Sequence, residues 1–107
     1  MVSDNLKRGT LELLLLAQLK HRDMYAYEMA MEIVRRSEGK YPVITVVVYP
    51  ILQRLEKKGL VTSRELITKE NRKTNIYHLE QAGSDYLEEQ RKALSFINDL
   101  LIDFLVK

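Results

Sequence analysis

The feature that most constrains this chain is an apolar stripe in its last quarter. Five residues recur at intervals of three, four or seven, namely Leu87, Leu94, Ile97, Leu101 and Phe104. This spacing predicts one long helix with a seam for pairing with a second helix, although Gln90 interrupts the stripe. The stripe would also suit packing on the first helix of the same chain. Because one small domain has little surface with which to cover two apolar helices, we expect the stripe to pair two copies of the chain.

Two helices are expected before residue 40. A leucine-rich segment predicts a helix over 4–20, with apolar residues on more than one face, as in helices buried against two surfaces. Gly9 is unfavourable inside a helix, so the alternative is a start at Thr10 as the N-cap. A second helix is expected over 24–37, with Asp23 as its N-cap. Its apolar face would contain Tyr27, Ala30, Met31 and Val34.

The segment 42–50 is the hardest to interpret, because its valines and isoleucine favour a strand. Val48, Leu52 and Leu55, however, recur at spacings of four and three, which favours a helix. A helix confined to the residues after position 51 would have only about two turns and would be marginal. We therefore predict one helix over 45–58, capped by Thr45, bent or weakened by Pro50 and ended by Gly59.

The rest of the chain predicts a hairpin and then the long helix. Strands are expected over 60–66 and 74–79, joined by a polar tip over 68–73. Three helices, a hairpin and a long helix are the element order of a winged helix-turn-helix followed by a dimerisation helix. The predicted fold is therefore mainly α with a small β-hairpin, divided into a winged helix-turn-helix domain over 1–79 and a C-terminal dimerisation helix over 80–107.

Charge is distributed unevenly along the chain. Residues 1–79 carry 14 Lys and Arg against nine Asp and Glu, whereas residues 80–107 carry three against six. A basic excess in the first part of a chain is a mild indication of nucleic-acid binding.

Composition and motifs exclude several functional classes. The chain has no cysteine, which rules out disulfide scaffolds, thiolate zinc sites and thiol catalysis. His21 and His78 each lack a carboxylate or second histidine at metal-ligand spacing, so we expect neither a metal nor a cofactor. No phosphate-binding glycine loop or nucleophile motif is present, and an enzyme is not expected. Residues 13–16 are too short an apolar run to span a bilayer, and the first residues lack a signal-peptide pattern, so a cytoplasmic protein without membrane contact is expected.

Four stretches form a pattern that is more specific together than separately. They are LKRGTLE at 6–12, MYAYE at 24–28, VYPILQRLEKKGLV at 48–61, and YHL at 77–79 with AG at 82–83. In this order they resemble the PadR family of bacterial transcriptional regulators over nearly the whole chain. The resemblance implies a homodimer that binds an inverted repeat in double-stranded DNA, usually as a repressor, and is released in several members by a small-molecule effector. The chain departs from the family at Val46 and Val47, where a small residue and a threonine are usual.

The resemblance assigns DNA contacts to the third helix, since a winged helix-turn-helix inserts this helix into the major groove. The expected contacts are Thr45, Val47, Tyr49, Gln53 and Arg54. Gln53 suits adenine, Val47 a thymine methyl group and Tyr49 a phosphate. The alternative is that Tyr49 packs at the base of the hairpin and Gln53 is merely solvated.

The hairpin would act as a wing. Its expected DNA contacts are Lys69, Arg72, Lys73 and Asn75, on phosphates or in the minor groove, and the alternative is an ordinary solvated loop. A pocket for a small hydrophobic or aromatic effector is expected near the dimer centre, lined by Phe96. The rival function is a winged-helix module that binds a protein partner instead of DNA, which the valine-rich start of the third helix favours.

Overall fold

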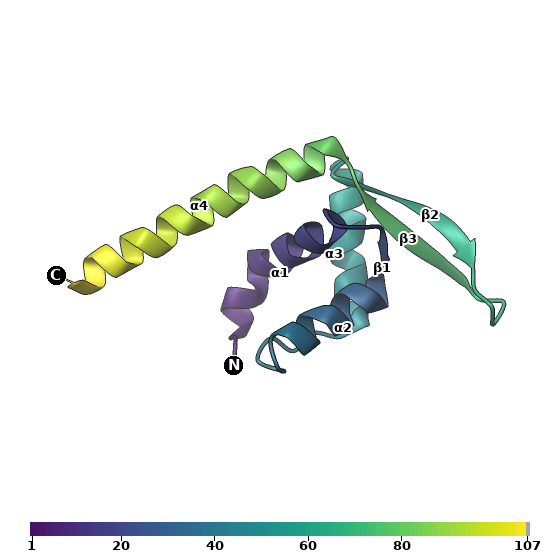
Figure 1. Cartoon of the computed structure of the whole chain (residues 1–107), viewed down its shortest axis with the longest axis horizontal. Coiled ribbons are helices and arrows are strands. Elements are labelled where there is room, and N and C mark those ends of the chain that lie inside the picture. Colours follow the sequence, from purple (N-terminus) through teal and green to yellow (C-terminus); the bar gives the residue numbers. More distant parts are fainter. Residues whose placement is uncertain (107) are drawn as a thin grey trace.

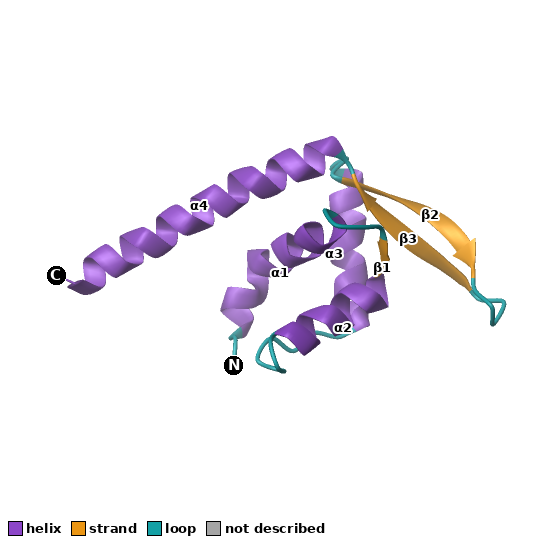
Figure 2. Cartoon of the chain, viewed as in Figure 1, coloured by secondary structure: helices purple, strands orange, loops and turns teal. Residues whose placement is uncertain are grey.

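The computed structural model describes residues 1–106, which form four helices and three strands (Figure 1). The elements are α1 (Asp4–Leu19), β1 (Met24–Tyr25), α2 (Ala26–Arg36), α3 (Thr45–Lys57), β2 (Val61–Ile67), β3 (Lys73–Leu79) and α4 (Gln81–Val106). Helices α1 to α3 gather into one body, the β2–β3 hairpin projects from it on one side, and α4 extends on the other (Figure 2). This arrangement confirms the predicted fold class. None of the helices within residues 1–106 is long and apolar enough to cross a membrane.

Helix α1 contains a kink between the two predicted starts. The helix begins at Asp4, where the Ser3 side chain accepts a hydrogen bond from the Leu6 amide at 3.3 Å. Arg8 and Gly9 leave helical geometry, and Gly9 has a φ of +78°, a conformation that glycine adopts without a Cβ clash. A second helical stretch then starts at Thr10, but Thr10 is its first residue and its hydroxyl donates to the Leu6 carbonyl, so it is not the predicted N-cap.

The start of the second predicted helix is wrong, because Met24 and Tyr25 form strand β1 instead. They pair antiparallel with β3, Met24 opposite Tyr77 and Tyr25 opposite Ile76. Helix α2 begins only at Ala26, and the Glu28 carboxylate accepts a hydrogen bond from the Tyr25 amide at 2.9 Å. Asp23 is therefore not the N-cap that was predicted.

The predicted buried face of α2 is also wrong, except at Ala30. Tyr27 and Met31 are 50% and 66% exposed, and Val34 is only half-buried. The residues that pack into the core are Ala26, Met29, Ala30 and Ile33. The spacing of apolar residues allowed two faces, and the strand β1 pairing decided which of them turns inward.

Helix α3 confirms the helical prediction over the strand propensity. Val48, Leu52 and Leu55 are at most 1% exposed and face α1 and α2 in the core. Burial of each such side chain stabilises the fold by about 1.5–3 kcal/mol, which outweighs a propensity difference of a few tenths per residue. The N-cap is Ile44, so the predicted cap Thr45 is instead the first residue of the helix.

The end of α3 lies at the predicted glycine. The Leu60 amide donates to the Leu55 carbonyl and the Gly59 amide donates to the Glu56 carbonyl, both at 3.0 Å. Gly59 has a φ of +76°. These two bonds and the left-handed residue form a Schellman motif, which satisfies the last carbonyls of the helix.

The sheet has the strand order β1–β3–β2 and is antiparallel throughout. The register of the hairpin runs from Val61 opposite Leu79 at the base to Ile67 opposite Lys73 at the tip. Val61 and Tyr77 are buried at the base, whereas the residues near the tip are mostly exposed. The hairpin is thus anchored in the core at one end and free at the other.

Helix α4 contacts the body only through its first turns. Tyr86 and Leu87 pack half-buried against the core, and α1 is the helix they adjoin. From Arg91 to Val106 every residue is exposed. The stripe residues Leu94, Ile97, Leu101 and Phe104 are between 47% and 72% exposed, whereas the fifth, Leu87, lies partly covered by its own chain.

Candidate nucleic-acid interface

The outward side of α3 consists of residues opposite its buried stripe. Val46, Tyr49 and Gln53 follow one another at spacings of three and four, which places them on one side of the helix. Val46 is 73% exposed, Tyr49 is 42% exposed, and Gln53 is also exposed. Thr45 is half-buried at the start of the helix. Val46 was missed by the sequence prediction, although a step of three residues back from Tyr49 identifies it.

Val47 and Arg54 lie on a neighbouring side of α3, along a groove of about 470 Å³ between α3 and the beginning of α1. Lys7 and Arg8 line the opposite wall of this groove. Asp4 and Glu12 line the same groove, and Arg54 lies in the last turn of α3, so the groove gathers charges of both signs along the helix. Lys7 and Arg8 were not predicted as site residues, because 46 residues of chain separate Arg8 from Arg54 and no periodicity connects them.

The tip of the hairpin is held by a short set of hydrogen bonds around Thr68. The Thr68 amide donates to the Arg72 carbonyl at 2.8 Å, and the Asn71 amide donates to the Thr68 carbonyl at 2.9 Å. The Thr68 hydroxyl oxygen accepts from the Arg72 amide at 3.2 Å. Asn71 takes a left-handed φ of +60°, which asparagine tolerates better than most residues.

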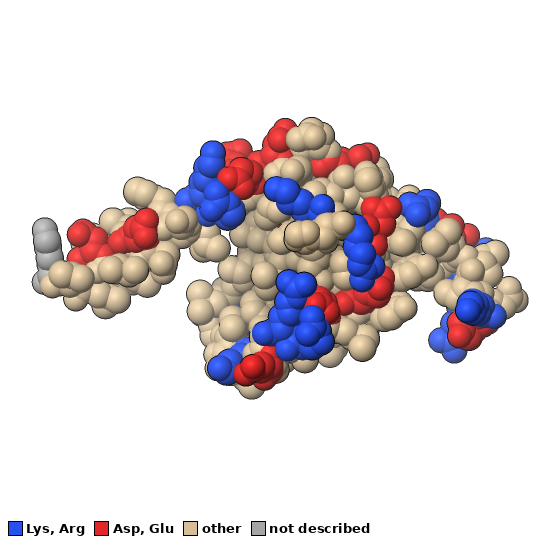
Figure 3. Space-filling model, viewed as in Figure 1, with Lys and Arg blue, Asp and Glu red and all other residues tan. Residues whose placement is uncertain are grey.

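This turn presents the predicted wing residues to solvent. Lys69, Arg72, Lys73 and Asn75 are all exposed. Among residues 1–106, no ion pair involves Lys69, Arg72 or Lys73. Blue Lys and Arg atoms accordingly gather at the end of the hairpin in Figure 3. Free cationic groups of this kind are available to bind an anionic partner.

The α1–β1 connection ties the hairpin to the helical body through Asp23. Its carboxylate oxygens lie 2.7 Å from His78 Nδ1 on β3 and 3.1 Å from the Arg64 guanidinium on β2. The contact with the His78 ring, and after it the hydrogen bond from Arg64, hold the pKa of the Asp23 carboxyl below its usual range. Asp23 and His78 are 55 positions apart, so this cluster depends on a contact made by the fold, and Glu80 also lies 3.9 Å from His78 Nε2.

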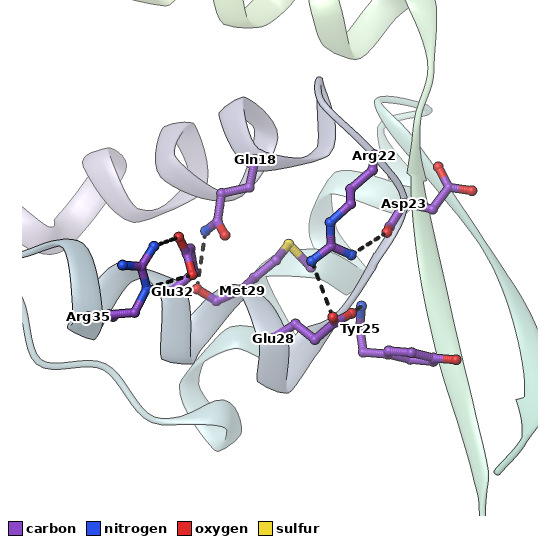
Figure 4. Close-up of polar contacts among 8 residues, drawn as sticks. All are labelled: Gln18, Arg22, Asp23, Tyr25, Glu28, Met29, Glu32 and Arg35. Atoms are coloured by element: carbon purple, nitrogen blue, oxygen red, sulfur yellow. Dashed lines mark hydrogen bonds and ion pairs between the residues drawn. The ribbon is translucent and has the colours of Figure 1, made fainter. Parts of the chain in front are cut away.

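Next to Asp23, Arg22 closes the junction between α1 and α2. Its guanidinium donates to the Asp23 carbonyl and pairs with the Glu28 carboxylate, both at 3.3 Å (Figure 4). Glu28 in turn binds the Tyr25 amide at the start of α2. These contacts hold α2 and the base of the sheet in a defined relation, which sets the position of α3 beside the hairpin.

The beginning of α3 and the hairpin tip both lie on the side of the body away from α4 (Figure 1). The structure thus places the start of α3 and the wing on one side of the body. Within the described part of the chain, no three His, Cys, Asp or Glu residues lie close enough to hold a metal ion.

The predicted effector residue lies elsewhere. Phe96 is 67% exposed on the free part of α4. A second groove, of about 670 Å³, lies between α1 and α2 and is lined by Leu14, Gln18 and Ile33 among others, but not by Phe96. Phe96 lines neither this groove nor the one between α1 and α3.

The chain was compared with known protein families. A family described as the transcriptional regulator PadR-like family matches residues 15–89, which is more than half of the chain. The chain belongs to the PadR-like family. This is a family of transcriptional regulators and not of enzymes, as the sequence pattern indicated.

Relatives and solved structures agree with this assignment. The transcriptional regulator YqjI of Escherichia coli is 34% identical over 91 residues, which are 85% of this PadR-like chain but only 42% of that protein. A transcriptional regulator from Clostridium thermocellum has the same fold, with a TM-score of 0.87 at 21% identity, over 97% of this chain and 98% of that one. Bacillus subtilis PadR, solved in complex with operator DNA, matches with a TM-score of 0.70 at 20% identity, over 76% of this chain and 46% of that one.

Proposed function

We propose that this PadR-like chain is a sequence-specific DNA-binding transcriptional regulator, a repressor that acts as a homodimer on an inverted-repeat operator. The observation that carries the proposal is that α3 has an exposed side and begins on the same side of the body as the tip of the hairpin, which carries unpaired cations. The fold shared with Bacillus subtilis PadR, which binds operator DNA, supports it.

In the proposed complex α3 enters the major groove and the wing follows the backbone. Gln53 forms a bidentate pair with adenine, and Val46 and Val47 contact thymine methyl groups. Tyr49 donates its hydroxyl to a phosphate, and Thr45 and Arg54 flank it on the same helix. Lys69, Arg72 and Lys73 neutralise phosphates or reach into the minor groove, with Asn75 beside them.

The proposed dimer forms through α4. Its exposed apolar residues need cover, and the four stripe residues from Leu94 onward are continuous with further exposed leucines such as Leu100 and Leu105. Exposed apolar surface of this extent is typical of an interaction site. A small hydrophobic or aromatic effector would bind at the dimer centre beside Phe96, where it would bias the relation between the two bodies.

Selection of bound sequences from a random duplex library, with purified protein at moderate salt, tests the function. We expect an enriched inverted repeat with half-sites about one helical turn apart. The oligomeric state is measured on the same preparation by sedimentation. A folded dimer that enriches no sequence, with and without cell-extract small molecules, would contradict the proposal.

A second candidate function rests on the apolar character of the α3 entry. Ile44 and Val46 are 65% and 73% exposed, which suits a protein partner better than a phosphate backbone. The two functions differ in their response to salt. DNA binding through several cations weakens steeply as salt rises, whereas docking through an apolar helix side does not.

A further inference from the structure

The joint between α4 and the body is built around an unusually close contact at Gly83. Gly83 is the one fully buried residue of α4 over 81–106. A Cβ at this position would lie 2.1 Å from the Leu60 carbonyl oxygen and 2.6 Å from Leu79 Cδ1. The first of these is a backbone atom, so it cannot rotate away. Only a residue without a side chain allows α4 to approach the body this closely.

The partner of Gly83 is itself held in place. The Leu60 carbonyl accepts a hydrogen bond from the Glu80 amide at 3.0 Å, just before α4 begins. Leu60 also follows Gly59 in the motif that ends α3, where its amide donates to Leu55. The surface on which Gly83 rests is therefore a direct continuation of α3.

One turn further along α4, a second contact fixes the direction of the helix. The Tyr86 hydroxyl donates to the Glu12 carboxylate of α1 at 2.6 Å. This hydrogen bond, and then burial, raise the pKa of Tyr86 to about 12, so the phenol remains a donor at neutral pH. Gly83 and Tyr86, one turn apart on α4, contact two different parts of the body, Leu60 and α1. Two such contacts fix the angle between α4 and the body.

A small change at this joint has a large effect at a distance. Relief of the 2.1 Å contact to an ordinary 3.4 Å moves α4 by about 1.3 Å at Gly83. With Tyr86 as pivot, about 4.5 Å along the axis, the tilt is about 15°. A point in the body about 20 Å from the joint then moves by about 5 Å, which is more than the rise of roughly 3.4 Å per base pair.

We propose that the Gly83–Leu60 contact and the Tyr86–Glu12 hydrogen bond determine the spacing of half-sites that the dimer accepts. They do so by setting the angle between α4 and the body that carries α3. In a dimer joined through α4, this angle decides how far apart the two α3 helices lie. The inference rests on the proposed homodimer and assigns specificity to residues that do not touch DNA.

The distance between the two α3 helices is measurable without DNA. Because the chain has no cysteine, Lys57→Cys introduces a single thiol for a spin label at the exposed end of α3. Pulsed dipolar spectroscopy on the labelled homodimer gives the α3–α3 distance. We expect Gly83→Ala to shift the mean distance by about 5 Å or more. Ala82→Ser, at the exposed neighbouring position, serves as the matched control and should leave the distance unchanged.

A second variant covers the case in which Gly83→Ala does not fold. Tyr86→Phe keeps the ring and removes only the hydroxyl that Glu12 binds. We expect it to broaden the distribution of α3–α3 distances, because the pivot is lost while the Gly83 contact remains. Circular dichroism establishes that each variant is folded.

Operators with half-sites moved apart or together by one base pair complete the test. Gly83→Ala should lose about 100-fold or more in affinity for the repeat that the wild type prefers, since only one half-site is then engaged, and should prefer another spacing. A dimer whose distance and preferred spacing are the same in all variants would overturn the inference and leave the proposed function intact. Absence of any dipolar distance in the wild-type protein would instead refute the homodimer, and the inference with it.

Discussion

Single side chains decide how firmly the wing is attached to the body. Asp23 lies in the connection before β1 and contacts one residue on each strand of the hairpin, His78 and Arg64. Its carboxylate is about 29% exposed, so solvent screens the two contacts only in part. This one acidic group therefore links the connection before β1 to both strands of the hairpin.

We predict that Asp23→Asn lowers stability in a pH-dependent way. The folded-state pKa of Asp23 is lowered, so the ionised carboxylate stabilises the fold above the ordinary aspartate pKa of about 3.9. This contribution is lost as the pH falls through the folded-state value. In thermal unfolding, the melting temperature of the variant should therefore be lower than that of the wild type at about pH 6. The two melting temperatures should be equal at about pH 2. Glu65→Gln, an exposed carboxylate on β2, is the control, and equal curves for Asp23→Asn and wild type would contradict the assignment.

Gln53 is the residue of α3 whose chemistry is most specific for one base. We predict that Gln53→Ala relaxes base preference at one position of each half-site, with a loss of about 1–3 kcal/mol in discrimination. The measurement is a repeated selection with the variant, compared with Lys58→Ala at the end of the helix. Equal weakening on all sequences would show that Gln53 positions the helix and reads no base.

At the scale of elements, the β2–β3 hairpin projects from the body and carries exposed cations at its tip. Its base is buried through Val61 and Tyr77, while Arg72 and Lys73 stand exposed at the tip. The base therefore contributes to the stability of the fold through buried side chains, whereas the tip offers charge for binding.

We predict that the double variant Arg72→Ala, Lys73→Ala weakens binding to every DNA sequence and flattens its salt dependence. Each phosphate contact contributes about 0.9 to the slope of log K against log salt, so two lost contacts on each of two wings lower the slope by up to about 3.6. Fluorescence anisotropy at several salt concentrations measures this slope. The control is the double variant Lys57→Ala, Lys58→Ala, which removes the same charge from the end of α3. It should change the salt slope less. An unaltered slope in the wing variant would remove the wing from the DNA interface.

At the scale of the whole molecule, the chain is too extended for a closed monomer. Its radius of gyration is 15.4 Å, and its extents are 59 × 30 × 21 Å. A compact domain of this length would have a radius of gyration of about 13 Å. The difference arises from α4, whose free part carries the apolar stripe away from the body. In the proposed homodimer, a second copy of the chain would cover this stripe.

We predict that Leu94→Asp converts the protein to monomers. An uncompensated charge in the seam costs about 3 kcal/mol, which is more than a hundredfold in the dimer dissociation constant. Analytical ultracentrifugation at micromolar concentration distinguishes the two states. Ser95→Asp adds the same charge beside the seam and should preserve the dimer. A stable Leu94→Asp dimer would place the interface on another surface.

The sequence was most informative where structure depends on neighbouring residues. The spacing of Val48, Leu52 and Leu55 predicted α3 against its strand propensity, and Gly59 marked its end. The hairpin and the length of α4 followed from patterns of the same kind. The cationic tip and the outward side of α3 could be predicted because exposed residues are those that the buried pattern leaves out. The same reasoning identifies Val46.

Tertiary structure decided what depends on contacts between distant segments. The pairing of Met24 and Tyr25 with β3 turned two predicted helical residues into a strand and changed the buried face of α2. No local sequence pattern predicts the Asp23–His78 contact or the approach of Gly83 to the Leu60 carbonyl. The amino-acid sequence by itself thus determined the order of the four helices and the hairpin, and the buried stripe of α3, because these follow from periodicity along one chain. The angles between elements were decided only by the fold, because they depend on which backbones can approach and which charges find a partner.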